Sequence, residues 1–101
     1  MIDTDPLRRL EEWYLANSDG DWEHQHGVTI QSLDNPGWSV EIDLQGTRLE
    51  EASLREVRVE RSDRDWYRCW IESRIFHARG GPGNLREMIG VFDHFSRDFS
   101  A

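Results

Sequence analysis

The first stretch of the chain repeats apolar residues at the spacing of a helix. The repeated positions, which would share one side of that helix, are Leu7, Leu10, Trp13 and Tyr14. Asp5 before them is a good N-cap, and Pro6 at the first helical position loses no hydrogen bond by lacking an N–H. The run Asn-Ser-Asp-Gly at residues 17–20 then interrupts the repeat, because these residue types favour turns. The pattern predicts a helix that begins at Pro6 and stops near Asn17.

The middle of the chain alternates apolar with polar residues, which is the period of a strand buried on one side. The alternation is clearest over residues 38–44, where four apolar residues alternate with three polar ones. Similar patterns predict strands at residues 28–31, 54–60, 66–72 and 75–78. Asp34-Asn35-Pro36-Gly37 is a strong turn signal before the clearest strand. We therefore expect an antiparallel β-meander of four to five strands.

A second helix is predicted after the run Gly80-Gly81-Pro82-Gly83, where apolar residues again recur at helical spacing. Asn84 suits the N-cap, and Glu87 three residues later can close a capping box. The apolar stripe of this helix comprises Leu85, Met88, Ile89, Phe92, Phe95 and Phe99.

These elements predict an α+β fold in a single domain over residues 1–101. Each helix has one apolar side and the sheet should have one too, so the economical arrangement packs both helices on one face of the sheet. The N-terminal helix, the meander and the C-terminal helix would then share one core. Its expected members include Trp13, Trp38, Val40, Ile42, Phe92 and Phe95.

The charge of the chain narrows the classes of partner. It has 12 basic residues, all of them arginine, and 20 acidic residues, which give a formal net charge of −8. A surface this acidic repels nucleic acid and the anionic inner leaflet of a membrane, and it steers a basic partner toward itself. We expect neither a nucleic-acid nor a membrane partner.

The chain also indicates a compartment. Charged residues interrupt the apolar residues near the N-terminus, so we expect no signal peptide, and no stretch approaches the roughly 20 apolar residues of a membrane span. Cys69 is the single cysteine, which excludes an intramolecular disulfide and fits a reducing environment. We expect a soluble, cytoplasmic protein.

His24 and His26 are the first candidates for chemistry. On a strand both would point to the same side, with Asp19, Asp21 and Glu23 nearby, so a metal site is conceivable. A metal usually needs three or four ligands, and the other candidates are loop carboxylates. We favour polar surface histidines and expect no metal and no cofactor.

Cys69 and Arg74 match the Cys-x4-Arg spacing of a rhodanese loop, which keeps a small sulfurtransferase as an alternative function. That chemistry needs an open loop leading into a helix N-terminus to lower the thiol pKa. Residues 66–72 instead alternate as a strand, where a cysteine packs as a small hydrophobe. The glycine-rich run at residues 80–84 lacks the Lys and Ser/Thr of a P-loop. We expect no enzyme, with a binding module that uses exposed tryptophans for a small uncharged ligand as the other alternative.

Three segments carry distinctive motifs. They are Leu10-Glu-Glu-Trp-Tyr-Leu15 running into Asp19-Gly-Asp-Trp-Glu-His24, Leu33-Asp-Asn-Pro-Gly-Trp-Ser-Val40 running into Ile42-Asp-Leu44, and Gly80-Gly-Pro-Gly-Asn-Leu85. Together with Arg61-Ser62-x-x-Asp65-Trp66 and in this order, they resemble the immunity protein 53 family of bacterial polymorphic toxin systems. The resemblance covers about residues 7–95. It implies a cytoplasmic antidote that binds and blocks a cognate toxin delivered by a neighbouring cell, and it carries over no catalytic residues.

Two acidic surfaces are candidates for the toxin contact. The favoured one comprises Asp19, Asp21, Trp22 and Glu23, with Asp34 on a turn expected nearby. Its carboxylates could imitate phosphates for a basic nuclease toxin, and tryptophan is enriched in interface hot spots. The alternative is the outward strand face, which carries Glu41, Asp43, Glu56 and Glu60. There, Arg58 and Arg68 on neighbouring strands should neutralise part of the charge.

Overall fold

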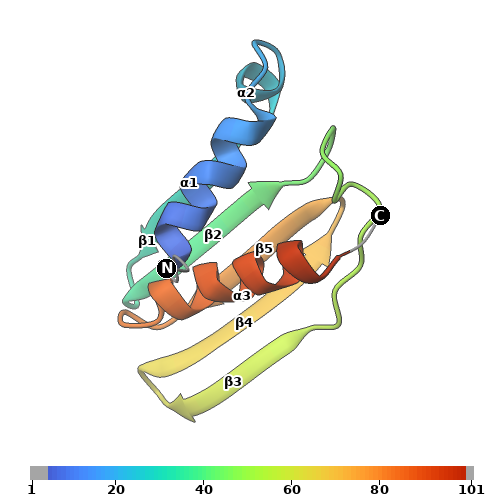
Figure 1. Ribbon diagram of the computed structural model, residues 1–101. Helices are drawn as coiled ribbons and strands as arrows, with labels where there is room; N and C mark the ends of the chain where they lie inside the picture. Colours follow the sequence, from blue (N-terminus) through green and yellow to red (C-terminus); the bar gives the residue numbers. More distant parts are fainter. Residues whose placement is uncertain (1–4, 100–101) are drawn as a thin grey trace.

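A computed structural model of the protein describes residues 5–99, which form an α+β fold as predicted. The elements in chain order are α1 Pro6–Asn17, α2 Trp22–Gln25, β1 Val28–Leu33, β2 Gly37–Asp43, β3 Val57–Ser62, β4 Asp65–Glu72, β5 Ile75–Gly80 and α3 Leu85–Asp98 (Figure 1). None of the helices within residues 5–99 is long and apolar enough to cross a membrane.

The strands form one antiparallel sheet in the order β1-β2-β5-β4-β3. β1 and β2 make a hairpin, while β3, β4 and β5 make a meander whose last strand returns to pair with β2. A meander through all the strands would place β3 beside β2, so the order differs from the expectation at that position. Residues 44–56 carry the chain from β2 to the far edge of the sheet (Figure 1).

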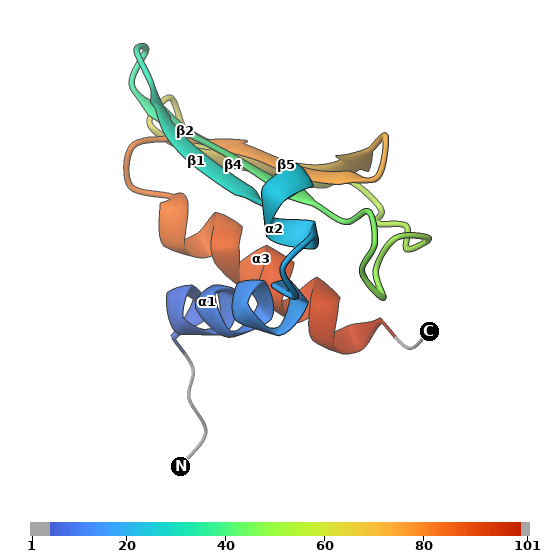
Figure 2. The same ribbon diagram turned by 90° about the horizontal axis from the view of Figure 1, so that it is seen from above.

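Both α1 and α3 lie on the same side of the sheet, as predicted, and within the described residues no helix covers the other side (Figure 2). The covered face holds Val40, Ile42, Cys69, Phe76 and Ala78, each 0% exposed. The strand register sets these residues side by side, with Val40 opposite Ala78 and Ile42 opposite Phe76. Burying each of the larger side chains contributes roughly 1.5–3 kcal/mol.

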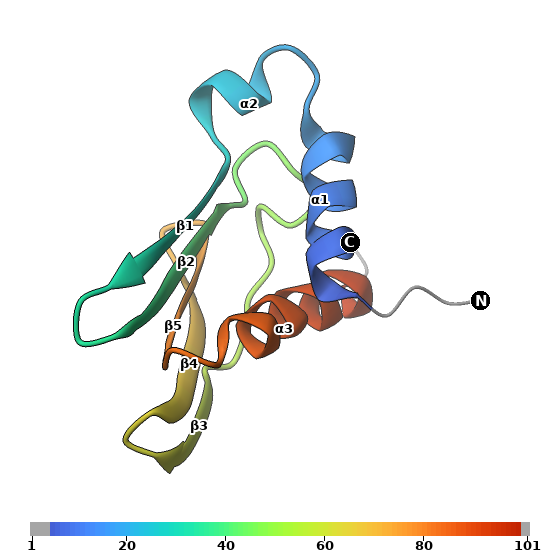
Figure 3. The ribbon, with the colours of Figure 1, turned by 90° about the vertical axis from the view of Figure 1, so that its left-hand side faces the viewer.

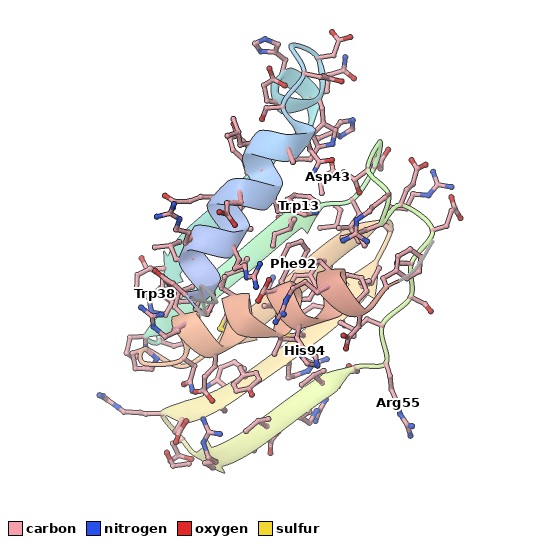
Figure 4. The ribbon with its side chains drawn as sticks, viewed as in Figure 1. Trp13, Trp38, Asp43, Arg55, Phe92 and His94 are labelled. Carbon is pink, nitrogen blue, oxygen red and sulfur yellow. The ribbon has the colours of Figure 1, made fainter. Side chains whose placement is uncertain are left out.

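Aromatic rings tie the two long helices to this core. Trp13 of α1 meets Phe92 of α3 edge to face, with ring centroids 5.1 Å apart, and both rings lie between the helices and the sheet (Figure 4). Phe92 meets Phe76 of β5 at 5.2 Å. Of the predicted core, Val40, Ile42, Phe92 and Phe95 are buried, while Trp13 and Trp38 are partly buried against it.

The N-terminal helix begins as the sequence predicts. The Leu7 N–H donates to the Asp5 carboxylate over 3.1 Å, so Asp5 is the N-cap. The apolar side of α1 is only partly covered, since Leu10 is 5% exposed but Leu7 is 48% and Tyr14 41% exposed. α1 packs mainly on α3 and not on the sheet, which leaves the margins of its apolar side in solvent.

The connection between β2 and β3 supplies core residues that the alternation does not predict. Leu49 is 0% and Ala52 8% exposed, although turns hold this segment. The alternation predicts a strand from residue 54, but β3 begins at Val57. Arg48 fastens the segment to the end of α3 by donating to the carbonyls of Ser96 and Phe99. Carbonyls in the last turn have no partner within a helix, so this contact closes the end of α3.

Candidate functional site

The loop between α1 and α2 is an acidic turn closed by its own carboxylates. Asp19 accepts hydrogen bonds from the backbone N–H groups of Asp21 and Trp22, each 3.0 Å long. Glu23 accepts from the N–H groups of Asp19 at 3.0 Å and Gly20 at 2.8 Å. The hydrogen bonds from Trp22 and Asp21 hold the pKa of the Asp19 carboxyl below its usual value. Two of the predicted contact residues therefore also build the turn that starts α2, a short helix that the sequence did not indicate.

Trp22 is not the exposed anchor that we expected. Its side chain is 6% exposed. The indole Nε1–H donates to the Gln45 carbonyl over 2.7 Å, and the ring meets Trp13 edge to face at 5.6 Å. The short helix α2 turns the indole inward, where a large aromatic surface gains more by burial than in a polar loop. In this structure Trp22 holds α2 against the 44–56 connection.

Asp34 does not join the acidic loop. It lies in the turn after β1, whereas the loop precedes β1 (Figure 3). β1 has 6 residues, and at about 3.3 Å per residue the two ends of such a strand are roughly 20 Å apart. The expectation that Asp34 is a neighbour is wrong, because an extended strand separates the two segments. Contact between the toxin and Asp19, Asp21 or Glu23 stays a prediction.

The two histidines do not lie together on a strand. His24 is exposed on α2, and His26 follows the helix with its Nδ1 2.7 Å from Oδ2 of Asp43. Within residues 5–99, no group of three or more His, Cys, Asp or Glu side chains is arranged to hold a metal ion.

Cys69 is a core residue in the middle of β4. It is 0% exposed, and burial raises the pKa of its thiol to about 12. The strand continues to Glu72, and Arg74 lies in the tight turn to β5 with a φ of 63°. The rhodanese spacing is therefore spread over a strand and a hairpin turn, and the thiol is buried in the core.

Two of the family-like motifs meet at a junction between β4 and α3, in which Asn84 is buried while Arg61, Asp65 and Glu87 are partly exposed. The Asn84 side chain, in a residue 2% exposed, accepts from the Trp66 N–H over 3.3 Å and donates to Asp65 over 2.9 Å and Glu87 over 2.8 Å. We expected the Asn84 side chain to cap α3, and this expectation is wrong. Its amide oxygen accepts from Trp66 and its amide nitrogen donates to carboxylates, so neither end bonds a backbone N–H of α3. Arg61 donates to the carboxylates of Asp65 and Glu87 at 2.8 Å. The Arg61 guanidinium and then the Asn84 amide lower the pKa of Asp65.

The glycines and prolines of the same motifs complete this junction. The Trp38 indole N–H donates to the Pro82 carbonyl over 3.0 Å. A Cβ on Gly81 would come within 2.3 Å of the Arg64 carbonyl oxygen, so this position requires glycine. These motif residues have a clear structural role, which explains their spacing without a ligand.

The helix-free side of the sheet carries an unexpected aromatic and cationic cluster. Trp70 of β4 lies opposite His77 of β5, and the rings stack with centroids 5.2 Å apart and planes 10° apart. The Arg68 guanidinium lies 4.9 Å from the centre of the Trp70 ring. Arg79 lies directly opposite Arg68. We call Arg68, Trp70, His77 and Arg79 the arginine–tryptophan centre. The alternation of residues 66–72 placed Arg68 and Trp70 on one face, but only the strand order brings β5 beside them.

Carboxylates surround this centre. Glu56 contacts both Arg58 and Arg68 at 3.1 Å, which confirms the predicted partial neutralisation of the strand face. The Arg68 and Arg58 guanidinium groups, in that order, lower the pKa of Glu56. Glu41 Oε2 lies 3.6 Å from His77 Nδ1. The outward face of the sheet is thus positive at its centre and negative around it.

An apolar groove lies on the helix side, between α3 and the β3–β4 edge. Its volume is about 710 Å³, and its apolar lining comprises Leu54, Val57, Tyr67, Val91, Phe95 and Phe99. Glu87, His94 and Asp98 of α3 also border it; His94 projects from the β3 side of that helix (Figure 4). None of its lining residues is a tryptophan, so this groove is not the tryptophan-lined cavity of the small-ligand alternative.

Comparison with known proteins adds one finding to this geometry. The family model described as immunity protein 53 matches residues 7–97, which is most of the chain. No curated protein and no solved structure matches it.

Proposed function

The chain belongs to the immunity protein 53 family, and from this premise we propose that it binds and neutralises a cognate bacterial toxin through a stoichiometric complex. The family match over residues 7–97 carries the proposal. An inhibitor of this kind makes and breaks no covalent bond, so it needs only a stable scaffold and a complementary surface. Membership of an immunity family suggests a protein that is not an enzyme.

The state of Cys69 supports this over the sulfurtransferase alternative. A nucleophilic cysteine must ionise near neutral pH and must be open to its substrate. The thiol of Cys69 is fully buried, and its pKa is raised to about 12. It would act neither as a thiolate nor as a persulfide carrier without unfolding of β4.

The net charge of the chain indicates the sign of the charge on the toxin surface that it binds. At −8, the chain attracts a basic partner over distances of the order of the Debye length, about 8 Å at physiological salt. We propose a toxin of a polymorphic system with a basic surface, of which a phosphate-gripping nuclease is the leading candidate. The complex would form in the cytoplasm of the cell that makes the antidote.

The proposal is tested by titrating toxin activity with the purified protein. The probe is a candidate toxin domain, namely the C-terminal domain of a large secreted protein sought in the reading frame next to this chain's gene. A stoichiometric inhibitor lowers activity linearly and abolishes it near one equivalent, and the mixture runs as a complex by light scattering. Time-dependent inactivation by a small fraction of an equivalent would indicate an enzyme instead. Absence of both complex and inhibition would refute the proposed function.

A further inference from the structure

We infer that the helix-free face of the sheet docks the toxin through the arginine–tryptophan centre, and that the toxin presents carboxylates to this centre and basic groups around it. This inference rests on the proposed function and assigns its contact surface. It shifts the main contact from the acidic loop to the sheet face, because Trp22 is buried whereas Trp70 lies on a face without a covering layer.

The centre is ordered before any partner arrives. Trp70 is held by the Arg68 guanidinium at 4.9 Å, by the His77 ring at 5.2 Å, and by a hydrogen bond from its Nε1–H to Glu72 over 3.2 Å. A side chain that is already fixed loses little rotamer entropy on binding, which favours affinity. Tryptophan and arginine are also the residue types most enriched in interface hot spots.

The arginines of this face cost the free protein stability. Arg58, Arg68 and Arg79 lie directly opposite one another across β3, β4 and β5, and like charges in such pairs repel. Glu56 offsets the charge of Arg58 and Arg68. The structure shows no ion pair from Arg79 to any carboxylate within residues 5–99, and the buried Nε of Arg68 lacks an acceptor there. An arrangement that the fold does not require points to a use in binding.

The sign of the charges specifies the partner. Around the centre, the outward positions of β2, β3 and β4 carry Glu41, Asp43, Glu60 and Glu72. Of these, Asp43 also contacts His26 and Glu60 also contacts Arg58. A complementary surface has carboxylates in the middle and Lys or Arg around them. An active site that uses carboxylates within a basic groove for a polyanionic substrate has this pattern. Arg79 is suited to a bidentate pair with one of those carboxylates, which would block the site directly.

Two other occupants fit the charges less well. A second copy of the chain would set one arginine row against another. A nucleic acid would meet the acidic surround and the net charge of −8. The toxin surface described above has carboxylates opposite the arginine–tryptophan centre and basic groups opposite the carboxylates around it, so it complements both charges.

The test compares two variants of the centre with a matched control. Affinity for a catalytically inactive form of the adjacent-gene toxin domain is measured for Arg79→Glu and Trp70→Ala. Arg8→Glu, on α1 on the other side of the sheet, makes the same charge change as the first variant. Arg79→Glu and Trp70→Ala should each weaken binding by about 30-fold or more, as expected for hot spots. The control should bind within about 3-fold of the wild type, since charges far from an interface act only through screened forces.

Folding and the alternative occupants are checked on the same proteins. Arg79→Glu removes a like-charge pair, so its urea midpoint should not fall. Any loss of binding by this variant is then due to the changed contact surface and not to unfolding. Wild-type affinity in both centre variants would overturn this inference and leave the proposed function intact, whereas no binding by the wild type would overturn the function itself. Wild-type binding to a labelled single-stranded oligonucleotide, or dimerisation of the free protein, would also overturn the inference if Arg79→Glu abolished it.

Discussion

The side-chain amide of Asn84 donates to the carboxylate of Asp65 over 2.9 Å at a position that is 2% exposed. This bond joins the first residue of β4 to the start of α3. The Trp66 N–H donates to the same side chain, so Asn84 gives this partly buried backbone group of β4 its acceptor.

Asn84→Ala should therefore lower the free energy of unfolding by about 1–3 kcal/mol, the usual cost of leaving a buried polar group without its partner. Urea denaturation followed by tryptophan fluorescence measures the change. Asn35→Ala, in the exposed turn after β1, is the matched control and should stay within about 0.5 kcal/mol. Equal effects of the two substitutions would show that the Asn84 contacts do not hold the junction.

Trp22→Ala should cost about 3–5 kcal/mol of stability, as expected when a buried aromatic side chain is removed. Trp22→Phe keeps most of the apolar area and loses the hydrogen bond to Gln45, so it should cost much less. Urea midpoints of both variants test this order. If Trp22→Ala instead kept the wild-type midpoint and weakened toxin binding, Trp22 would be the surface anchor that the sequence suggested.

Asp21→Asn is the cleanest probe of the acidic loop. Asp21 is exposed and its side chain makes no capping hydrogen bond, whereas Asp19 and Glu23 also build the turn. If the loop steers the toxin, the association rate should fall by about 2-fold at low salt, the difference should fade at high salt, and the dissociation rate should not change. Stopped-flow mixing with the toxin domain measures both rates. Asp63→Asn, in the β3–β4 turn, is the control. An equal effect of this substitution would show that the association rate depends on the net charge of the protein and not on the position of the loop.

The Cys69 thiol should make stability fall at alkaline pH. Its pKa is raised from 9.0 to about 12 in the folded protein. Above pH 9 the unfolded chain loses this proton while the folded chain keeps it, so stability is full below pH 9 and declines between pH 9 and 12. The decline attributable to Cys69 should approach about 1.4 kcal/mol per pH unit in that window. Cys69→Ser should be modestly less stable, should still neutralise the toxin, and should lack this contribution. Parallel pH profiles of the two proteins would contradict the assignment.

Arg74→Gly should stabilise the protein by about 0.5–1 kcal/mol, because a left-handed backbone strains any residue with a Cβ. The turn between β4 and β5 holds Ser73 and Arg74 at φ values of 55° and 63°. The ion pair of Arg74 with Glu51 is exposed, and its loss should cost little. Arg64→Gly in the β3–β4 turn is the control and should destabilise slightly, since that residue does not have a positive φ. A drop in thermal stability of Arg74→Gly would contradict the expected relief of strain.

The sequence by itself determined the elements and their apolar sides. The cap at Asp5 and the turn at residues 34–37 follow from rules that act over a few neighbouring residues, and so does the alternation of Val40 and Ile42. Such local signals predicted both long helices, the five strands and the packing of the helices on one face. The family-like motifs also indicated the class of function, because they are themselves a property of the sequence.

Only the tertiary structure decided where the remaining side chains lie. The sequence suggested that Trp22 lies on the surface, but α2 directs its indole to the Gln45 carbonyl in the 44–56 connection. The sequence likewise suggested that Asn84 caps a helix, but in the structure its side chain binds β4. The arginine–tryptophan centre exists because β5 lies between β2 and β4, which sets His77 on Trp70 and Arg79 beside Arg68. These contacts join residues distant in sequence, and their formation depends on strand order and register, which no local pattern specifies.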